Sequence, residues 1–223
     1  MRVFQSLAGD EYAQRAMVAA APPQIRTFPG VARLLVPPCP DDKQRVIIYC
    51  GPATQPWGPA SLKSGIGGSE EAVIFQSREL SRLGYHVEVY AFPALEEIGT
   101  DAHGVVWAPY HALDEQAAPD IYISWRQFRG DLRCPHAAQR WLWLHDVIHS
   151  QWFTEEFVSS WTGIFCLTEW HAKGLPAYAQ RRVVLTKNGL DPTFLFHGEN
   201  KASRFVYASS PDRGLEQLLE LWP

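Results

Sequence analysis

Short apolar runs recur along the chain from residue 45 onward, separated by segments of mixed polarity. Most are rich in β-branched and aromatic residues, which favour strands, and they cover residues 46–50, 85–90, 105–107, 120–125, 140–145, 162–168 and 183–186. The segments between several of them, such as 70–83, 151–160 and 169–179, are long enough for helices. This alternation predicts a Rossmann-like α/β fold, in which a parallel sheet carries helices on both faces.

The pattern changes at both ends of this region. Residues 1–44 contain Pro22, Pro23, Pro29, Pro37, Pro38 and Pro40, a density typical of a linker or an extended arm. After residue 192 the alternation stops, and only a strand at 204–208 and an amphipathic helix at 215–221 are predicted. One such unit cannot bury its own apolar face. We therefore expect a proline-rich arm over 1–44, a domain over 45–192, and a linker and the start of an incomplete second domain over 193–223.

Composition narrows the functional classes. The formal net charge is −4 and the pI is near 6.1, which argues against a dominant nucleic-acid function. The four cysteines include no CxxC pair, so neither a disulfide framework nor a zinc site is predicted. Without an apolar run of membrane-spanning length or a secretory leader at residues 1–14, we expect a cytoplasmic protein with no transmembrane segment.

A glycine-rich stretch follows the first predicted strand. Gly65, Gly67 and Gly68 precede Ser69, a candidate N-cap for the helix that comes next. The free N–H groups of a helix N-terminus suit a phosphate or a sugar hydroxyl, but a tight turn would use the same residues. The spacing matches neither the P-loop nor the dinucleotide fingerprint. The long proline-containing loop before it also disfavours a dehydrogenase domain.

His145 and Asp146 stand at the end of a predicted central strand. Ligands of parallel sheets bind at the carboxyl ends of the strands. His145 could act on a substrate hydroxyl or orient it, and Asp146 could hold the imidazole tautomer or bind a hydroxyl. Alternatively, they are polar residues that cap a strand. His149 follows closely, but no third clear ligand does, so no metal site is predicted.

Three further positions are candidates for ligand contact. Arg126 ends another predicted strand and either reaches a phosphate or is exposed to solvent. Asn188 begins a turn after the last strand of the series. Ser210 and Arg213 precede the final helix, where an arginine and free N–H groups could hold a diphosphate. The alternative for that loop is an ordinary helix cap.

The order of these motifs resembles family 4 of the retaining glycosyltransferases, from about Arg45 to the end of the chain. The residues that carry the resemblance are the glycine loop 67–70, the strand ending at His145, the Asn-Gly-Leu-Asp stretch at 188–191 and the loop at 209–214. That family has the GT-B fold, in which two Rossmann-like domains face a cleft. The resemblance implies that Gly67 and Gly68 lie by the acceptor and the donor phosphates, that His145 lines the sugar site, and that Arg213 belongs to a diphosphate clamp. Ser210 stands where that clamp usually has an arginine.

The implied activity is transfer of a hexose from a nucleotide sugar to an acceptor hydroxyl, with retention. The acceptor would be a carbohydrate, a lipid or a protein, and neither a cofactor nor a metal is implied. Peripheral contact with a membrane is compatible with this function. Because the paired glutamates of the family lie deeper in the second domain than Pro223, we expect this chain alone to lack activity. The alternative is a non-catalytic Rossmann-like module that binds a carbohydrate or a protein.

Overall fold

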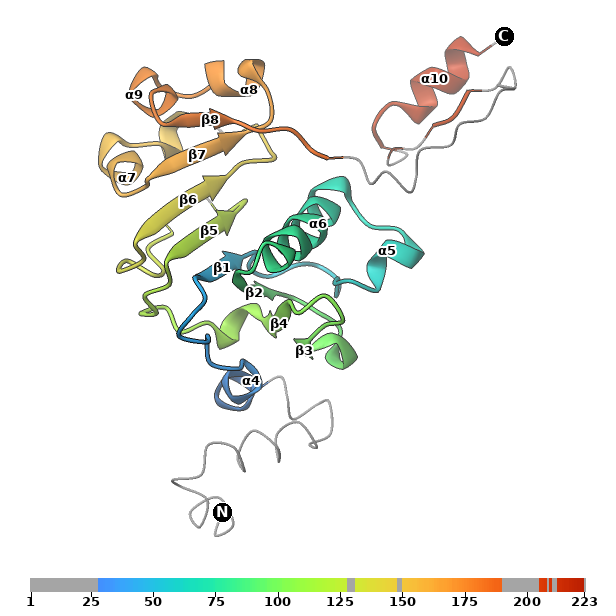
Figure 1. The fold of residues 1–223 in the computed structure, drawn as a ribbon. Helices are drawn as coiled ribbons and strands as arrows, with labels where there is room; N and C mark the ends of the chain where they lie inside the picture. The colour runs from blue at the N-terminus through green and yellow to red at the C-terminus, as the bar shows by residue number, and fades with distance from the viewer. Residues whose placement is uncertain are drawn as a thin grey trace. The chain divides into compact units, whose positions relative to one another are not determined.

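An eight-stranded sheet organises the protein. The computed structural model describes residues 28–127, 131–147, 150–189, 205–207, 209 and 212–222. The strands are β1 (Arg45–Tyr49), β2 (His86–Ala91), β3 (Gly99–Thr100), β4 (Val106–Pro109), β5 (Ile121–Trp125), β6 (Gln139–Trp143), β7 (Gly163–Cys166) and β8 (Val183–Leu185). Their order is β3-β4-β2-β1-β5-β6-β7-β8 (Figure 1), and only the short β3 runs antiparallel to its neighbour. The predicted Rossmann-like parallel α/β sheet is confirmed.

The strand order reverses at β1. This strand pairs with β2 on one side, where Ile48 lies opposite Val89, and with β5 on the other, where Ile48 lies opposite Ile123. All of these side chains are buried, which explains why the runs are apolar without alternation. In a parallel sheet, such a reversal opens a crevice at the carboxyl ends of the two strands that flank it. The topology therefore places a ligand site next to the ends of β1 and β5.

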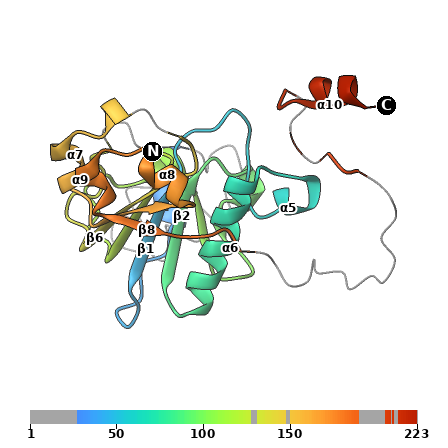
Figure 2. The same cartoon turned by 90° about the horizontal axis from the view of Figure 1, so that it is seen from above.

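Helices cover both faces of the sheet (Figures 1 and 2). They are α4 (Pro29–Leu35), α5 (Ser61–Ser64), α6 (Gly68–Arg82), α7 (Glu155–Ser159), α8 (Glu169–Lys173) and α9 (Ala177–Gln180), with short 3-10 turns η1 (Leu95–Glu97), η2 (Tyr110–Ala112) and η3 (Ser150–Trp152). On one face, α6 packs Val73 and Ile74 against the strands. Apolar residues of α4, α7 and α9 belong to the cluster on the other face.

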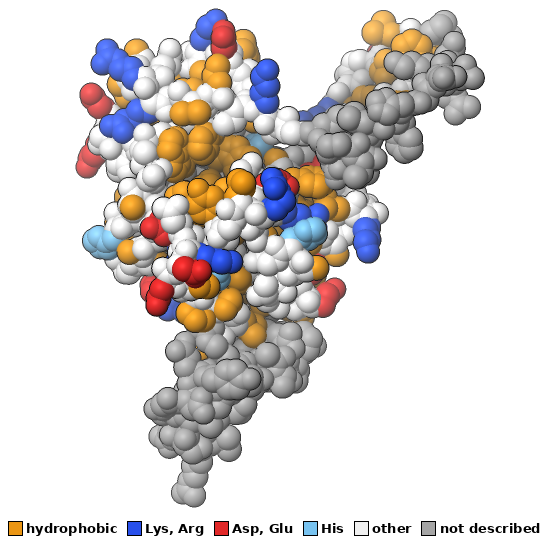
Figure 3. Space-filling view, viewed as in Figure 1, with side chains coloured by type: hydrophobic (Ala, Val, Ile, Leu, Met, Phe, Trp, Pro, Cys, Tyr) orange, Lys and Arg blue, Asp and Glu red, His pale blue; other side chains and the backbone are white. Residues whose placement is uncertain are grey.

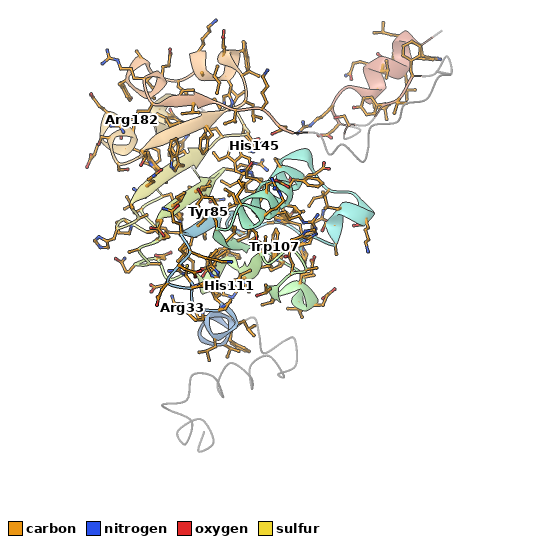
Figure 4. The ribbon with its side chains drawn as sticks, viewed as in Figure 1. Arg33, Tyr85, Trp107, His111, His145 and Arg182 are labelled. Atoms are coloured by element: carbon orange, nitrogen blue, oxygen red, sulfur yellow. The ribbon has the colours of Figure 1, made fainter. Side chains whose placement is uncertain are left out.

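Helix α4 lies within residues 1–44, where a proline-rich arm was expected. Ala32 is fully buried, and the Arg33 guanidinium donates hydrogen bonds to the carbonyl oxygens of Ala112 and Leu113, both at 3.0 Å. Figure 4 shows Arg33 and His111 in this region. Pro29 occupies the first turn of the helix, where a missing N–H costs nothing. The prolines at this point mark a helix start, so residues 29–36 pack on the sheet and do not form an extended arm.

Two predicted crossover helices are each divided in two. Thr154 caps α7, since its hydroxyl accepts a hydrogen bond from the Phe157 N–H, and this separates α7 from η3. Pro176 precedes α9, and a proline at that place cannot continue α8. Among the described helices, none has both the length and the apolar content of a membrane span.

The chain divides into two compact units, residues 1–188 and 189–223. In the second unit, α10 (Leu215–Leu221) forms where a helix is predicted. The strand predicted at 204–208 is wrong for its described residues 205–207, which are not in a strand. Phe205 and Val206 are largely exposed, and a strand needs a neighbour to pair with.

Candidate functional site

The candidate site lies where β5 and β6 end beside the start of α6. The Leu144 N–H donates to the Phe165 carbonyl oxygen at 3.0 Å, which continues the sheet pairing one residue past β6. The chain then delivers His145 to the carboxyl edge of the sheet, and Figure 4 shows this histidine beside α6. The predicted position of His145 at the end of a central strand agrees with the structure.

The His145 ring contacts two indoles. Its centroid is 4.9 Å from that of Trp143 and 6.1 Å from that of Trp125. Trp57 continues the row, with its ring 5.7 Å from Trp125 and 5.9 Å from Trp107. A continuous row of buried indoles, from one loop and three strands, therefore underlies His145.

This environment keeps the imidazole neutral. Burial, and then the positive charge of Arg126, lower the pKa of His145 to about 4. Its Nε2 atom is buried and has no hydrogen-bond partner among the described residues. At neutral pH the ring can therefore exchange hydrogen bonds with a hydroxyl, but it carries no charge.

Arg126 connects the elements that surround His145. Its Nε donates to Asp146 Oδ2 at 2.6 Å, and its Nη1 lies 3.4 Å from both Glu70 Oε1 and the Ser69 hydroxyl. The guanidinium also lies over the Trp125 ring, 5.1 Å from the centroid. These contacts join the ends of β5 and β6 to the first turn of α6. We call Arg126, Asp146 and Glu70 the ion-pair cluster.

The backbone of Arg126 is unusual. Its φ of 59° lies in the left-handed region, which costs energy for a residue with a side chain. Its N–H still donates to the Trp143 carbonyl oxygen at 3.0 Å. Strain of this kind persists where surrounding contacts compensate for it, and it is common at functional sites.

The glycine loop has a different capping arrangement from the predicted one. Gly67 is the N-cap of α6, without a side-chain cap, and Ser69 lies inside the first turn. The Ser69 hydroxyl donates to Glu70 Oε2 at 2.7 Å. That carboxylate lies so close to Gly67 that a Cβ there would collide with it, whereas a Cβ on Gly68 would meet nothing within 4 Å. A side chain at position 67 would therefore displace the Glu70 carboxylate, whereas one at position 68 would not.

Gln127 ties β5 to the end of β1. Its Nε2 donates to the Cys50 carbonyl oxygen at 3.0 Å. Gly51, with φ of 71°, makes room for this side chain, since a Cβ there would lie 2.6 Å from Nε2. The only sequence signal for this contact is the glycine itself, directly after the first strand.

Of the other predicted site residues, some lie at this site and others do not. Asp146 joins the site, but the hydrogen bond described for it comes from Arg126 and not from His145. Asn188 is exposed beyond β8 and makes none of the contacts described above. Arg213 is exposed in the second unit, where Gly214 is the N-cap of α10. Ser210 lies outside the described residues, as do His149 and residues 190–191.

The sequence did not indicate the contacts of Arg126 or the burial of His171. Arg126 was left open between a phosphate contact and solvent, whereas it pairs with carboxylates. His171 on α8 is buried, and its Nε2 has no hydrogen-bond partner among the described residues. Within the same residues, no group of three His, Cys, Asp or Glu side chains gathers that could hold a metal ion.

A surface depression of about 530 Å³ lies along α10. Leu215, Glu216, Leu219 and Glu220 line it. It is formed by one face of a single short helix and contains none of the candidate residues. The arrangement of chemical groups therefore favours the carboxyl edge of the sheet as the site.

No family model, curated protein or solved structure matches this chain. A function must therefore be argued from the side chains of the site and from the order of the motifs.

Proposed function

We propose that residues 45–192 form the acceptor-side domain of a retaining glycosyltransferase of family 4, with a GT-B fold. The reaction is transfer of a hexose from a nucleotide sugar to a hydroxyl of a carbohydrate, lipid or protein acceptor. The observation that carries the proposal is the neutral imidazole of His145, packed beside Trp125 and Trp143 at the carboxyl edge of the sheet.

The chemistry of the site suits a sugar. A neutral imidazole can accept a hydrogen bond at one nitrogen and donate one at the other, which matches a hydroxyl group. The indoles of Trp125 and Trp143 are themselves buried, so they support the imidazole from within the core. With a pKa of about 4, His145 orients and polarises a hydroxyl and does not serve as a cationic acid at neutral pH.

The remaining roles follow from the same proposal. Departure of the nucleoside diphosphate develops negative charge, which cations and N–H dipoles stabilise electrostatically. Arg213 is proposed to bind the diphosphate, by the resemblance in motif order. The proposal requires no metal and no cofactor. Gly67 and Gly68 are assigned to contact with the acceptor.

The test is turnover of nucleotide sugars. Because this chain alone is expected to lack activity, a protein that joins it to a complete second domain is incubated with a panel of donors and acceptors, and release of nucleoside diphosphate is measured. We expect His145→Ala to reduce the rate on the order of a hundredfold or more, because removal of a positioned polar group typically has this effect. His136→Ala is the matched control, since His136 is exposed and lies before β6. An unchanged rate in His145→Ala would remove His145 from the reaction.

One observation favours a second candidate, a non-catalytic module that binds hydroxyl-bearing ligands. Arg126, the cation beside His145, is already paired with two carboxylates and is therefore poorly placed to receive a diphosphate. Calorimetric titration with nucleotide sugars and free carbohydrates separates the two candidates. Binding of carbohydrates with no donor turnover, even when the chain is joined to a complete second domain, would support the module, whereas transfer or donor hydrolysis would exclude it.

A further inference from the structure

The ion-pair cluster carries an excess of negative charge. Glu70 and Asp146 are two carboxylates, Arg126 is one cation, and His145 is neutral at pH 7. Arg126 and Glu70 are a third exposed or less, and the Asp146 side chain is 48% exposed. A ligand that touches His145 from the solvent side therefore meets a cluster with a formal charge of −1, part of which faces water.

The start of α6 would ordinarily oppose this charge. A helix of 15 residues places partial positive charge at its N-terminus, which attracts anions. Here the chain supplies its own anions, because Glu70 and Glu71 lie in the first turn. The Glu70 carboxylate lies against Gly67 and accepts the Ser69 hydroxyl. The start of α6 at this glycine loop therefore already has a carboxylate beside it, which opposes the approach of a phosphate.

The guanidinium of Arg126 is committed in the same way. Its Nε donates to Asp146, and its Nη1 lies within 3.4 Å of Glu70 and Ser69. A phosphate that approached Arg126 would have to replace one of these partners and leave the displaced carboxylate beside it. The close 2.6 Å contact with Asp146 makes that exchange unfavourable.

We infer that Glu70 and Asp146 act as specificity-determining residues, which make this site select uncharged or cationic sugars over phosphorylated ones. The inference rests on the proposed function, namely that the site takes a hydroxyl-bearing ring. Repulsion of the wrong ligand by fixed charges is a common source of specificity. Under this inference, an uncharged acceptor binds beside His145 and the ion-pair cluster. The phosphates of the donor bind elsewhere.

The test compares three sugars of the same ring. The full chain is titrated with methyl glucoside, glucosamine and glucose 6-phosphate, and NMR signals of the Trp125 and Trp143 indoles and the His145 ring are followed. A phosphate monoester carries nearly two negative charges at pH 7. We expect glucose 6-phosphate to bind on the order of tenfold more weakly than methyl glucoside, or worse, at low salt, and glucosamine at least as tightly. Added salt should narrow the gap.

Variants connect the selectivity to the carboxylates. Glu70→Gln and Asp146→Asn should each raise the affinity for glucose 6-phosphate relative to methyl glucoside. Glu79→Gln is the control, because Glu79 lies near the far end of α6 and pairs with Arg82. It should leave the ratio unchanged.

The outcomes separate this inference from the function beneath it. If glucose 6-phosphate binds as tightly as methyl glucoside, the inferred selection against phosphorylated sugars is wrong. The proposed hydroxyl-binding site is then still supported. If the preference persists unchanged in both carboxylate variants, Glu70 and Asp146 do not cause it, and the inference is equally overturned. If none of the three sugars shifts the site signals, the proposed hydroxyl site fails and the inference fails with it.

Discussion

At the scale of single residues, Arg126 combines a costly backbone conformation with contacts that only its side chain can make. Two substitutions separate these effects. Arg126→Ala and Arg126→Gly both remove the ion pairs, but only glycine adopts a φ of 59° without a steric cost. We expect the glycine variant to be more stable than the alanine variant by about 1 kcal/mol in urea unfolding. Equal stabilities would show that the backbone is unstrained in solution.

His145 should make stability depend on pH. Its pKa is about 4 in the folded protein and near 6.5 in an unfolded chain. Between these values the unfolded state binds a proton that the folded state does not, so the free energy of unfolding falls as the pH drops from 6.5 to 4. His145→Gln should lose this part of the pH dependence. Urea unfolding at a series of pH values measures it, and identical slopes in both proteins would contradict it.

The residue scale also shows what the sequence could not reveal. His145 was predicted to lie at the end of a strand, and it does, because strand ends can be located from apolar runs. The partners of Arg126 were not predicted, because Glu70 and Asp146 lie 56 and 20 residues away from it along the chain. Only the tertiary fold brings those charges together, and no local pattern records it.

At the scale of elements, the α6 face of the sheet carries an aromatic stack over β6 and β7. The rings of Trp141 and Phe165 are 4.6 Å apart and inclined by only 3°. Apolar residues of α7, α8 and α9 belong to the opposite face, so this part of the sheet lacks their cover. Figure 3 shows apolar side chains gathered around a hollow on this side of the molecule.

The stack of Trp141 on Phe165 depends on the absence of a side chain at Gly163. A Cβ at this position would collide with the Trp141 ring, which lies opposite it in the paired strands. We expect Gly163→Ala to destabilise the protein by about 1–3 kcal/mol. The loss should shrink when Trp141→Ala is added, which a double-mutant cycle measures. Gly30→Ala is the control, since its Cβ meets nothing within 4 Å.

Element prediction succeeded where burial alone decides the structure. β2 is buried throughout and β1 is buried after Arg45, and their apolar runs located both strands within one residue. Helix α4 was missed because proline was taken as a breaker, although it begins a helix here. The strand predicted at 204–208 was wrong because strand propensity without a pairing partner does not make a strand. Local sequence pattern therefore does not predict an element whose formation depends on contacts with residues distant in the chain.

At the scale of the whole molecule, the buried core of the described residues lies in the first unit. Its buried apolar residues run from Ala32 to Ala179, and α10 buries none of its residues. We expect a chain truncated after Asn188 to unfold cooperatively with a Tm within about 2 °C of the full chain. The peptide 189–223 alone should show little helix in circular dichroism, because a helix of seven residues is marginal in water. A large fall in Tm would show that the second unit contributes to the core.

The place of β1 at the middle of the sheet has a consequence for how fast the protein folds. β5 pairs with β6, β6 with β7 and β7 with β8. This part of the sheet can therefore form by adding each strand to the one that precedes it in the chain. β1 must instead meet β5 across a separation that runs from Val46 to Ile121. Closing so long a loop costs entropy before any contact repays it, and folding slows as contacts become less local. We expect the docking of β1 against β5 to limit the rate of refolding.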